Sequence, residues 1–130
     1  MALLHRRGSF AAGRWTQLDE VHGTRVLQVI AAGDHDFETG DAMVTRARGA
    51  VLAAWVGDCA PVGFVADDGT IGVAHAGWRG AYDGVLQAAV AQLGPTRVRA
   101  YLGPCIHPCC YEFGAADLQM FVGRFGSQVA

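Results

Sequence analysis

The chain alternates short apolar runs with glycine, aspartate and proline, a pattern that predicts a series of β-strands over its first half. Strands are expected at residues 26–30, 51–56, 62–66 and 71–75, with a short extended segment at 41–45. The first eighteen residues are weakly patterned, and we expect them to be loose or to pair only as an edge. His75 ends the last of these runs, at the point where the sequence breaks into glycines.

The apolar period becomes helical near Tyr82. A helix is expected over 82–93, where the apolar residues fall on one face and Gly94 and Pro95 end it. A strand at 97–102, a proline-containing loop at 103–110 and a second amphipathic helix at 115–125 follow. The pattern predicts an α+β fold, with a mixed, largely antiparallel sheet covered by the two helices, in a single domain over residues 1–130.

Composition narrows the class of protein. The chain is 52% hydrophobic with a formal charge of −2, and it contains no apolar run long enough to cross a bilayer. Its amino-terminal residues do not resemble a secretory signal, so we expect a cytoplasmic protein. Without a basic stripe, neither nucleic acid nor a membrane is an expected partner. All ten basic residues are arginines, so only arginine can hold an anion with a permanent charge.

The four cysteines are expected to be reduced thiols. Cys105, Cys109 and Cys110 fall within one short loop and Cys59 stands alone, a spacing that does not match the paired knuckles of structural zinc. A chain this apolar does not need disulfides to fold.

Two histidines and one cysteine stand at strand boundaries. His22 precedes one expected strand, Cys59 lies between two others and His75 ends a fourth. Each alone is more often a packed or hydrogen-bonded residue than a ligand. Together, if the strands are neighbours, they form a His-Cys-His set with an open fourth position, typical of catalytic zinc and compatible with copper.

Five ordered blocks resemble the motifs of the YfiH/laccase-domain family. They are EVHGTRV at 20–26, GDAMVT at 40–45, GDCAPV at 57–62, HAGWRG at 75–80 and GPCIHPCCYEFG at 103–114. The resemblance covers about Val21 to Phe113 and implies a YfiH-like α+β fold. Five matches in order are far more specific than any one of them.

The resemblance implies that His22, Cys59 and His75 are metal ligands and catalytic residues. Family members are described as zinc-dependent purine nucleoside phosphorylases, which cleave adenosine, inosine, guanosine and methylthioadenosine with phosphate and also deaminate adenosine. They are also described as copper-dependent polyphenol oxidases (laccases). Several coppers need many imidazoles, and the chain has five histidines, which favours zinc and the phosphorylase.

Further residues of these motifs are candidates for the substrate pocket. Arg79, between two glycines, is the candidate for binding phosphate, and its structural alternative is pairing with Asp58 or Asp83. Trp78 is a candidate for stacking on a purine, and the alternative is a packed core aromatic. We place Asp58 and Cys105 in the pocket wall and expect Cys105 to be the reactive thiol of its loop.

The chain departs from the family in two respects. Glu20 stands where members usually carry glutamine, and the chain is short at both ends, so the domain is expected to be incomplete at its C-terminus. A third hypothesis is therefore a truncated, non-catalytic metal-binding domain. We also expect the apolar face of helix 115–125 to be exposed and to allow homo-oligomers; it comprises Leu118, Phe121, Val122 and Phe125.

Overall fold

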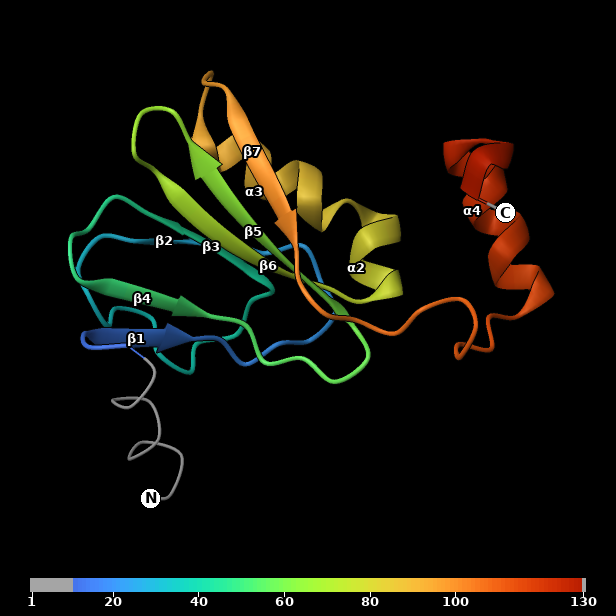
Figure 1. The fold of residues 1–130 in the computed structure, drawn as a ribbon, viewed down its shortest axis with the longest axis horizontal. Helices are drawn as coiled ribbons and strands as arrows, with labels where there is room; N and C mark the ends of the chain where they lie inside the picture. Colours follow the sequence, from blue (N-terminus) through green and yellow to red (C-terminus); the bar gives the residue numbers. More distant parts are fainter. Residues whose placement is uncertain (1–10, 130) are drawn as a thin grey trace.

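A central five-stranded sheet organises the protein, for which a computed structural model describes residues 11–129. In spatial order its strands are β2 (Val26–Val29), β3 (Ala42–Thr45), β6 (Ile71–Ala76), β5 (Ala60–Ala66) and β7 (Val98–Leu102) (Figure 1). The β2 and β3 strands are parallel, and the other neighbours are antiparallel. The predicted α+β class with a mixed, largely antiparallel sheet is confirmed.

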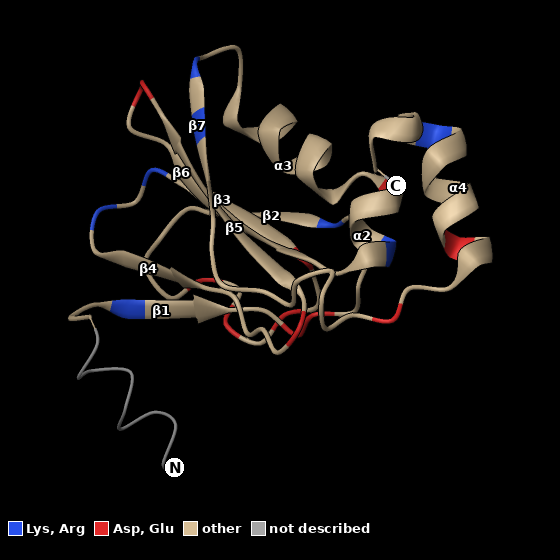
Figure 2. Ribbon diagram, turned by 45° about the vertical axis from the view of Figure 1, so that its right-hand side comes forward, with Lys and Arg blue, Asp and Glu red and all other residues tan. Residues whose placement is uncertain are grey.

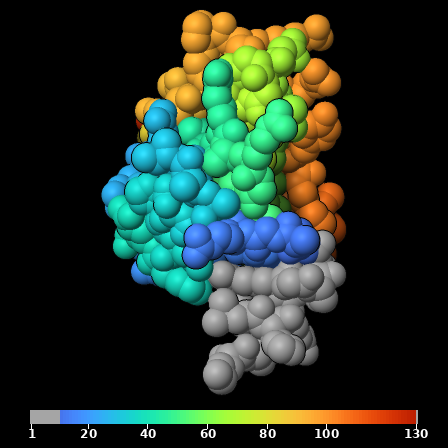
Figure 3. All heavy atoms as spheres, turned by 90° about the vertical axis from the view of Figure 1, so that its left-hand side faces the viewer, coloured from blue at the N-terminus to red at the C-terminus, as the bar shows by residue number. Residues whose placement is uncertain are grey.

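Two further strands form a separate pair that packs against one face of this sheet. The strands β1 (Arg14–Gln17) and β4 (Ala50–Ala53) pair in parallel. The first of them lies in the weakly patterned segment 1–18, which was expected to be loose or to pair as an edge, and residues 1–10 of that segment lie outside the described part of the chain. Figure 3 shows its atoms beside those that follow β2, and the Thr16 hydroxyl donates to the Asp34 carbonyl at 2.8 Å. The strand predicted at 51–56 runs from Ala50 to Ala53 and ends before the exposed Trp55.

The apolar core lies on both faces of the five-stranded sheet. The α3 helix (Val85–Leu93) packs on one face, where its buried residues meet Val44, Phe64 and Ala74. On the other face a second cluster forms between the sheet and the β1–β4 pair; it consists of Leu18, Leu27, Val29 and Met43. The two clusters hold the strands in a fixed register, on which the site described below depends.

The helix predicted over 82–93 is two helices. The α2 helix (Trp78–Asp83) begins four residues before the predicted start, and α3 follows after Gly84, whose φ of 105° lies in the left-handed region that favours glycine. The apolar period did not show this break, because Tyr82, Val85 and Leu86 keep a helical spacing across Gly84. The early start brings Trp78 and Arg79 into a helix directly after β6.

The α4 helix (Ala115–Phe125) has the predicted bounds, but its position differs from the prediction. It lies beyond α2, away from the sheet that it was expected to cover, and a short 3-10 turn at Ser127–Val129 follows it (Figures 1 and 2). Its apolar face is half-buried, since Phe121 contacts Tyr82 at 5.3 Å and Phe113 at 5.5 Å between ring centroids. No residue of α4 is fully buried.

Among residues 11–129, no helix has both the length and the apolar character to cross a membrane.

Candidate metal centre

His75 occupies the end of β6 and is 4% exposed. The register that pairs Ala42 with Ala74 sets Asp41 opposite His75, and the His75 amide donates to the Asp41 carbonyl at 2.7 Å. On its other side, His75 lies opposite Pro61 of β5. The backbone of three adjacent strands therefore fixes the position of this imidazole.

The carboxylate of Asp41 joins His75 to the loop that carries His22. It accepts Nδ1–H of His75 at 2.9 Å and the backbone amides of His22 and Gly23 at 2.8 Å each, with Val21 slightly farther away. Burial acts to raise the pKa of Asp41, but these four donors outweigh it and the pKa is lowered. An ionised Asp41 keeps the proton of His75 on Nδ1 and leaves Nε2 free to bind a metal.

His22 and Cys59 complete the group. His22 has a φ of 62°, a left-handed backbone that the Asp41 hydrogen bonds hold in place. Its Nε2 lies 3.6 Å from the Cys59 Sγ, and its ring meets that of His75 edge to face at 4.8 Å between centroids. One ligand atom from each of the three side chains lies within 4.8 Å of the others.

The donor set fits a zinc ion. With zinc–nitrogen and zinc–sulfur bonds of about 2.0–2.3 Å, two ligands of a tetrahedral ion stand roughly 3.5 Å apart. The 3.6 Å between His22 and Cys59 agrees with that spacing. Three protein ligands leave one position open, which is the arrangement of catalytic rather than structural zinc.

Gly77 makes this close approach possible. A Cβ atom added there would lie 2.4 Å from Cδ2 of His22 and 3.1 Å from the Cys59 Sγ. Any side chain at this position would therefore displace two of the three candidate ligands.

The electrostatics of the site favour a cation. Burial raises the pKa of Cys59, and the negative charges of Asp58, Glu20 and Asp41 raise it further. Burial likewise raises the pKa of Glu20, although its carboxylate accepts the Trp55 amide at 2.8 Å. Figure 2 shows acidic residues on the loops at this end of the sheet. A bound cation would offset these charges and favour the thiolate.

A cleft of about 420 Å³ opens beside the three residues. Its lining includes His22, Asp58, Cys59, Trp78, Arg79, Cys105 and Tyr111. The structure thus places all the predicted pocket residues along one cleft, whereas the buried His75 lies behind it. The volume falls within the range of small-molecule sites.

Arg79 and Trp78 form a stacked pair in this cleft. The guanidinium carbon of Arg79 lies 4.7 Å from the centroid of the half-buried Trp78 ring, whose edge meets Phe113. Within the described part of the chain Arg79 makes no ion pair, so the alternative of pairing with Asp58 or Asp83 is not observed. Its charge is available to an anion that enters the cleft.

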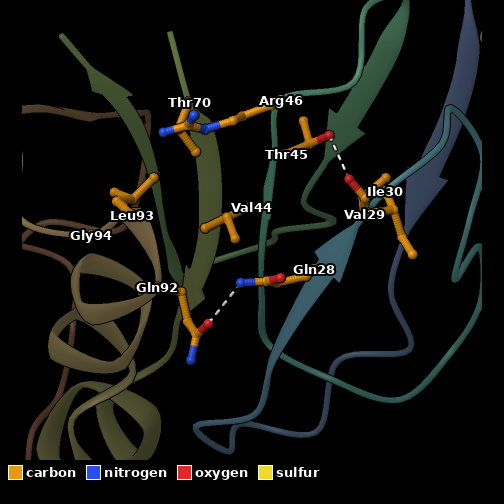
Figure 4. Close-up of a pocket in the computed structure, with 10 residues that line it drawn as sticks. All are labelled: Gln28, Val29, Ile30, Val44, Thr45, Arg46, Thr70, Gln92, Leu93 and Gly94. Atoms are coloured by element: carbon orange, nitrogen blue, oxygen red, sulfur yellow. Dashed lines mark hydrogen bonds between the residues drawn. The ribbon is translucent and has the colours of Figure 1, made fainter. Parts of the chain in front are cut away.

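A second cavity, of about 310 Å³, lies between the end of β2 and the end of α3 (Figure 4). Its polar side chains are paired with one another or with the backbone: Gln28 donates to Gln92 at 3.0 Å, and Thr45 donates to the Val29 carbonyl at 2.7 Å. Arg46 binds Thr70 and Asp68. Because Arg46 is paired, the cavity lacks an available cation such as Arg79 in the first cleft.

Sequence reasoning did not assign a role to Asp41 or Gly77. Both lie within the motifs quoted above. A signal for Asp41 was present in the sequence, because this acidic residue directly precedes a strand of apolar and small residues. Its function depends on the pairing of β3 with β6, which a linear pattern does not give.

Comparison with known proteins identifies the family. A family model described as multi-copper polyphenol oxidoreductase laccase matches residues 1–129. The chain belongs to the YfiH/laccase-domain family. One curated relative is the purine nucleoside phosphorylase of Xylella fastidiosa, which is 46% identical to this laccase-domain chain. The alignment covers 82% of the chain and 44% of the relative. The purine nucleoside phosphorylase YfiH of Escherichia coli is 35% identical over 91% of the chain and 51% of the relative.

Solved structures agree with this assignment. Neisseria meningitidis protein NMB0706 has a TM-score of 0.81 at 26% identity, covering 94% of this chain and 51% of that one. YlmD of Geobacillus stearothermophilus has a TM-score of 0.74 at 28% identity, covering 93% of this chain and 50% of that one. This laccase-domain chain spans about half the length of the curated relatives that it matches.

Proposed function

We propose that this chain provides the metal centre and phosphate-binding arginine of a zinc-dependent purine nucleoside phosphorylase. The observation that carries the proposal is the convergence of His22, Cys59 and His75 beside a cleft that contains Arg79. The names of the curated relatives supply the substrate class, a purine nucleoside with phosphate. The products are the free base and ribose 1-phosphate.

The side chains of the cleft have separate roles in this proposal. A bound zinc ion would supply a Lewis acid at the open position. Arg79 holds the phosphate, and its stacking on Trp78 keeps the guanidinium oriented toward the cleft. Asp41 keeps His75 in the tautomer that binds the metal through Nε2. Adenosine deamination is proposed as a second activity of the same centre, and the reduced thiols fit a cytoplasmic enzyme.

Polyphenol oxidation with copper is the competing function, and it is favoured by the description of the family. Within residues 11–129, His22 and His75 belong to the only cluster of three or more candidate metal-binding side chains. A multicopper centre needs more imidazoles than this cluster offers. The donor set therefore supports zinc.

The test compares two histidines that share a left-handed backbone. His22 has a φ of 62° and His35 a φ of 60°, and asparagine tolerates this conformation. The purified chain and the variants His22→Asn and His35→Asn would be analysed for zinc and for hypoxanthine release from inosine with phosphate. We expect one zinc per chain and turnover in the parent and in His35→Asn, and loss of both in His22→Asn.

Other outcomes decide among the alternatives. Turnover that survives in His22→Asn would contradict the proposed centre. Zinc without turnover in the parent would identify a non-catalytic metal-binding domain. Copper with oxidation of a phenol would establish the oxidase instead.

A further inference from the structure

Two adjacent thiols lie outside the candidate metal centre. Cys109 and Cys110 are both exposed and free, and their sulfur atoms stand 3.2 Å apart. Neither belongs to the His22, Cys59 and His75 cluster.

The backbone holds these thiols in a defined turn. The Cys110 amide donates to the His107 carbonyl at 2.9 Å, and the Ile106 amide donates to the Asp58 carbonyl at 3.0 Å. On the other side, Tyr111 stacks on Phe113 with 5.8 Å between ring centroids. These contacts fix the backbone of the turn, and in it the two sulfur atoms face each other at 3.2 Å.

Two neighbouring thiols have a specific chemistry. Thiolate sulfur selects soft cations such as Cu(I), and two of them form a chelate that a single thiol cannot form. Two thiolates on one tetrahedral ion with bonds of about 2.3 Å stand roughly 3.5–4 Å apart, and two that hold Cu(I) in linear coordination stand farther apart than that. Because both side chains are exposed, rotation about χ1 can open the present 3.2 Å to the spacing that a bound ion requires.

We propose that Cys109 and Cys110 form a two-thiol site for a thiophilic cation of the Cu(I) class, separate from the His-Cys-His centre. The site is independent of the proposed phosphorylase function. It has one practical consequence: copper content alone would not distinguish this site from the His-Cys-His centre and would not by itself indicate an oxidase.

Phenylarsine oxide tests the paired geometry, because it forms a stable adduct only with two close thiols. Two S–H bonds break and two As–S bonds form, while the oxygen leaves as water and no atom changes oxidation state. Intact-mass spectrometry of the zinc-loaded chain should show one adduct per chain. The adduct should be absent from Cys109→Ser and from Cys110→Ser and retained in Cys105→Ser.

Copper binding supplies the second readout. In competition with the Cu(I) chelator bicinchoninate, the parent should retain one more Cu(I) per chain than the double variant Cys109→Ser/Cys110→Ser. Both proteins should unfold at the same temperature, which shows that the variant is folded. Three results would overturn the proposal. The arsenical adduct could persist in Cys109→Ser, the parent could form no adduct, or the parent and the double variant could retain equal amounts of Cu(I).

Discussion

Two regions of the protein are held in place by different means. One is the end of the sheet that carries His75, and the other is the C-terminal segment 103–129 that carries α4, called the α4 arm below. His75 and Asp41 are almost fully buried between paired strands, and their side chains are hydrogen-bonded to each other. The α4 helix buries no residue and is attached by aromatic contacts between Phe121, Tyr82 and Phe113. The geometry of the candidate metal centre therefore depends on the strands, and we expect that α4 can be perturbed without changing it.

The largest effect is expected at Asp41. In Asp41→Asn an amide group would face backbone N–H donors inside the core, and His75 would lose a charged partner. Because several buried hydrogen bonds to a charged group are weakened at once, we expect the free energy of unfolding to fall by about 3 kcal/mol and zinc affinity to fall by roughly 10–100-fold. Urea denaturation and zinc titration measure the two effects.

Asp68→Asn is the matched control for this change. Asp68 also accepts a backbone amide and pairs with an arginine, Arg46, but at the exposed end of the sheet away from the site. We expect little loss of stability and unchanged zinc affinity. If Asp41→Asn and Asp68→Asn lowered stability and zinc affinity equally, burial would not explain the importance of Asp41.

The second effect is expected at Gly77. In Gly77→Ala the new methyl group would displace His22 and Cys59, so the chain should lose its zinc and about 1–3 kcal/mol of stability. Gly57→Ala, where an added Cβ has no atom within 4 Å, should keep zinc and stability. Zinc analysis and thermal unfolding compare the two variants, and full zinc content in Gly77→Ala would refute the predicted close approach.

A smaller effect is expected in the α4 arm. Phe121→Ala removes the ring that contacts Tyr82 and Phe113, so it should cost about 1–2 kcal/mol and expose α4 to proteolysis while zinc content stays constant. Gly123→Ala adds a methyl group that meets no atom within 4 Å, and it should protect the helix. Zinc loss in Phe121→Ala would show that the two regions are coupled.

The smallest effect concerns the surface acid Glu38. Hydrogen bonds from His35 and then Arg25 lower its pKa below the ordinary value of 4.5. The hydrogen bonds to ionised Glu38 therefore stabilise the fold at pH values above 4.5. This stabilisation is lost as the pH falls through the lower pKa that Glu38 has in the folded protein. Glu38→Gln should therefore lower the melting temperature slightly at about pH 6 and not at about pH 2. An equal difference at both pH values would show that the charge is not responsible.

Much of the fold could be predicted from the sequence, because local pattern determines local structure. The bounds of α4 follow from its amphipathic period, and the alternating apolar runs located β3, β5 and β6. The break at Gly84 could not be predicted, because helix-compatible apolar spacing continues through it. Nor could the position of α4, since its half-buried face is compatible with a sheet or with another helix.

The candidate centre was predictable only in part, for a related reason. Ligand types at strand ends, together with five family-like motifs, identified His22, Cys59 and His75. Their convergence and the role of Asp41 depend on strand order and register, which are tertiary properties. The left-handed backbone of His22 is likewise imposed by Asp41 rather than by local sequence.

X-ray absorption at the zinc edge tests the central claim most directly. The measurement would use the zinc-loaded Cys109→Ser/Cys110→Ser variant, so that no sulfur from the paired thiols can contribute. We predict one sulfur at about 2.3 Å and two imidazole nitrogens at about 2.0 Å, with one further light atom in the open position. A zinc shell without sulfur, or with a single imidazole, would contradict a centre built from His22, Cys59 and His75.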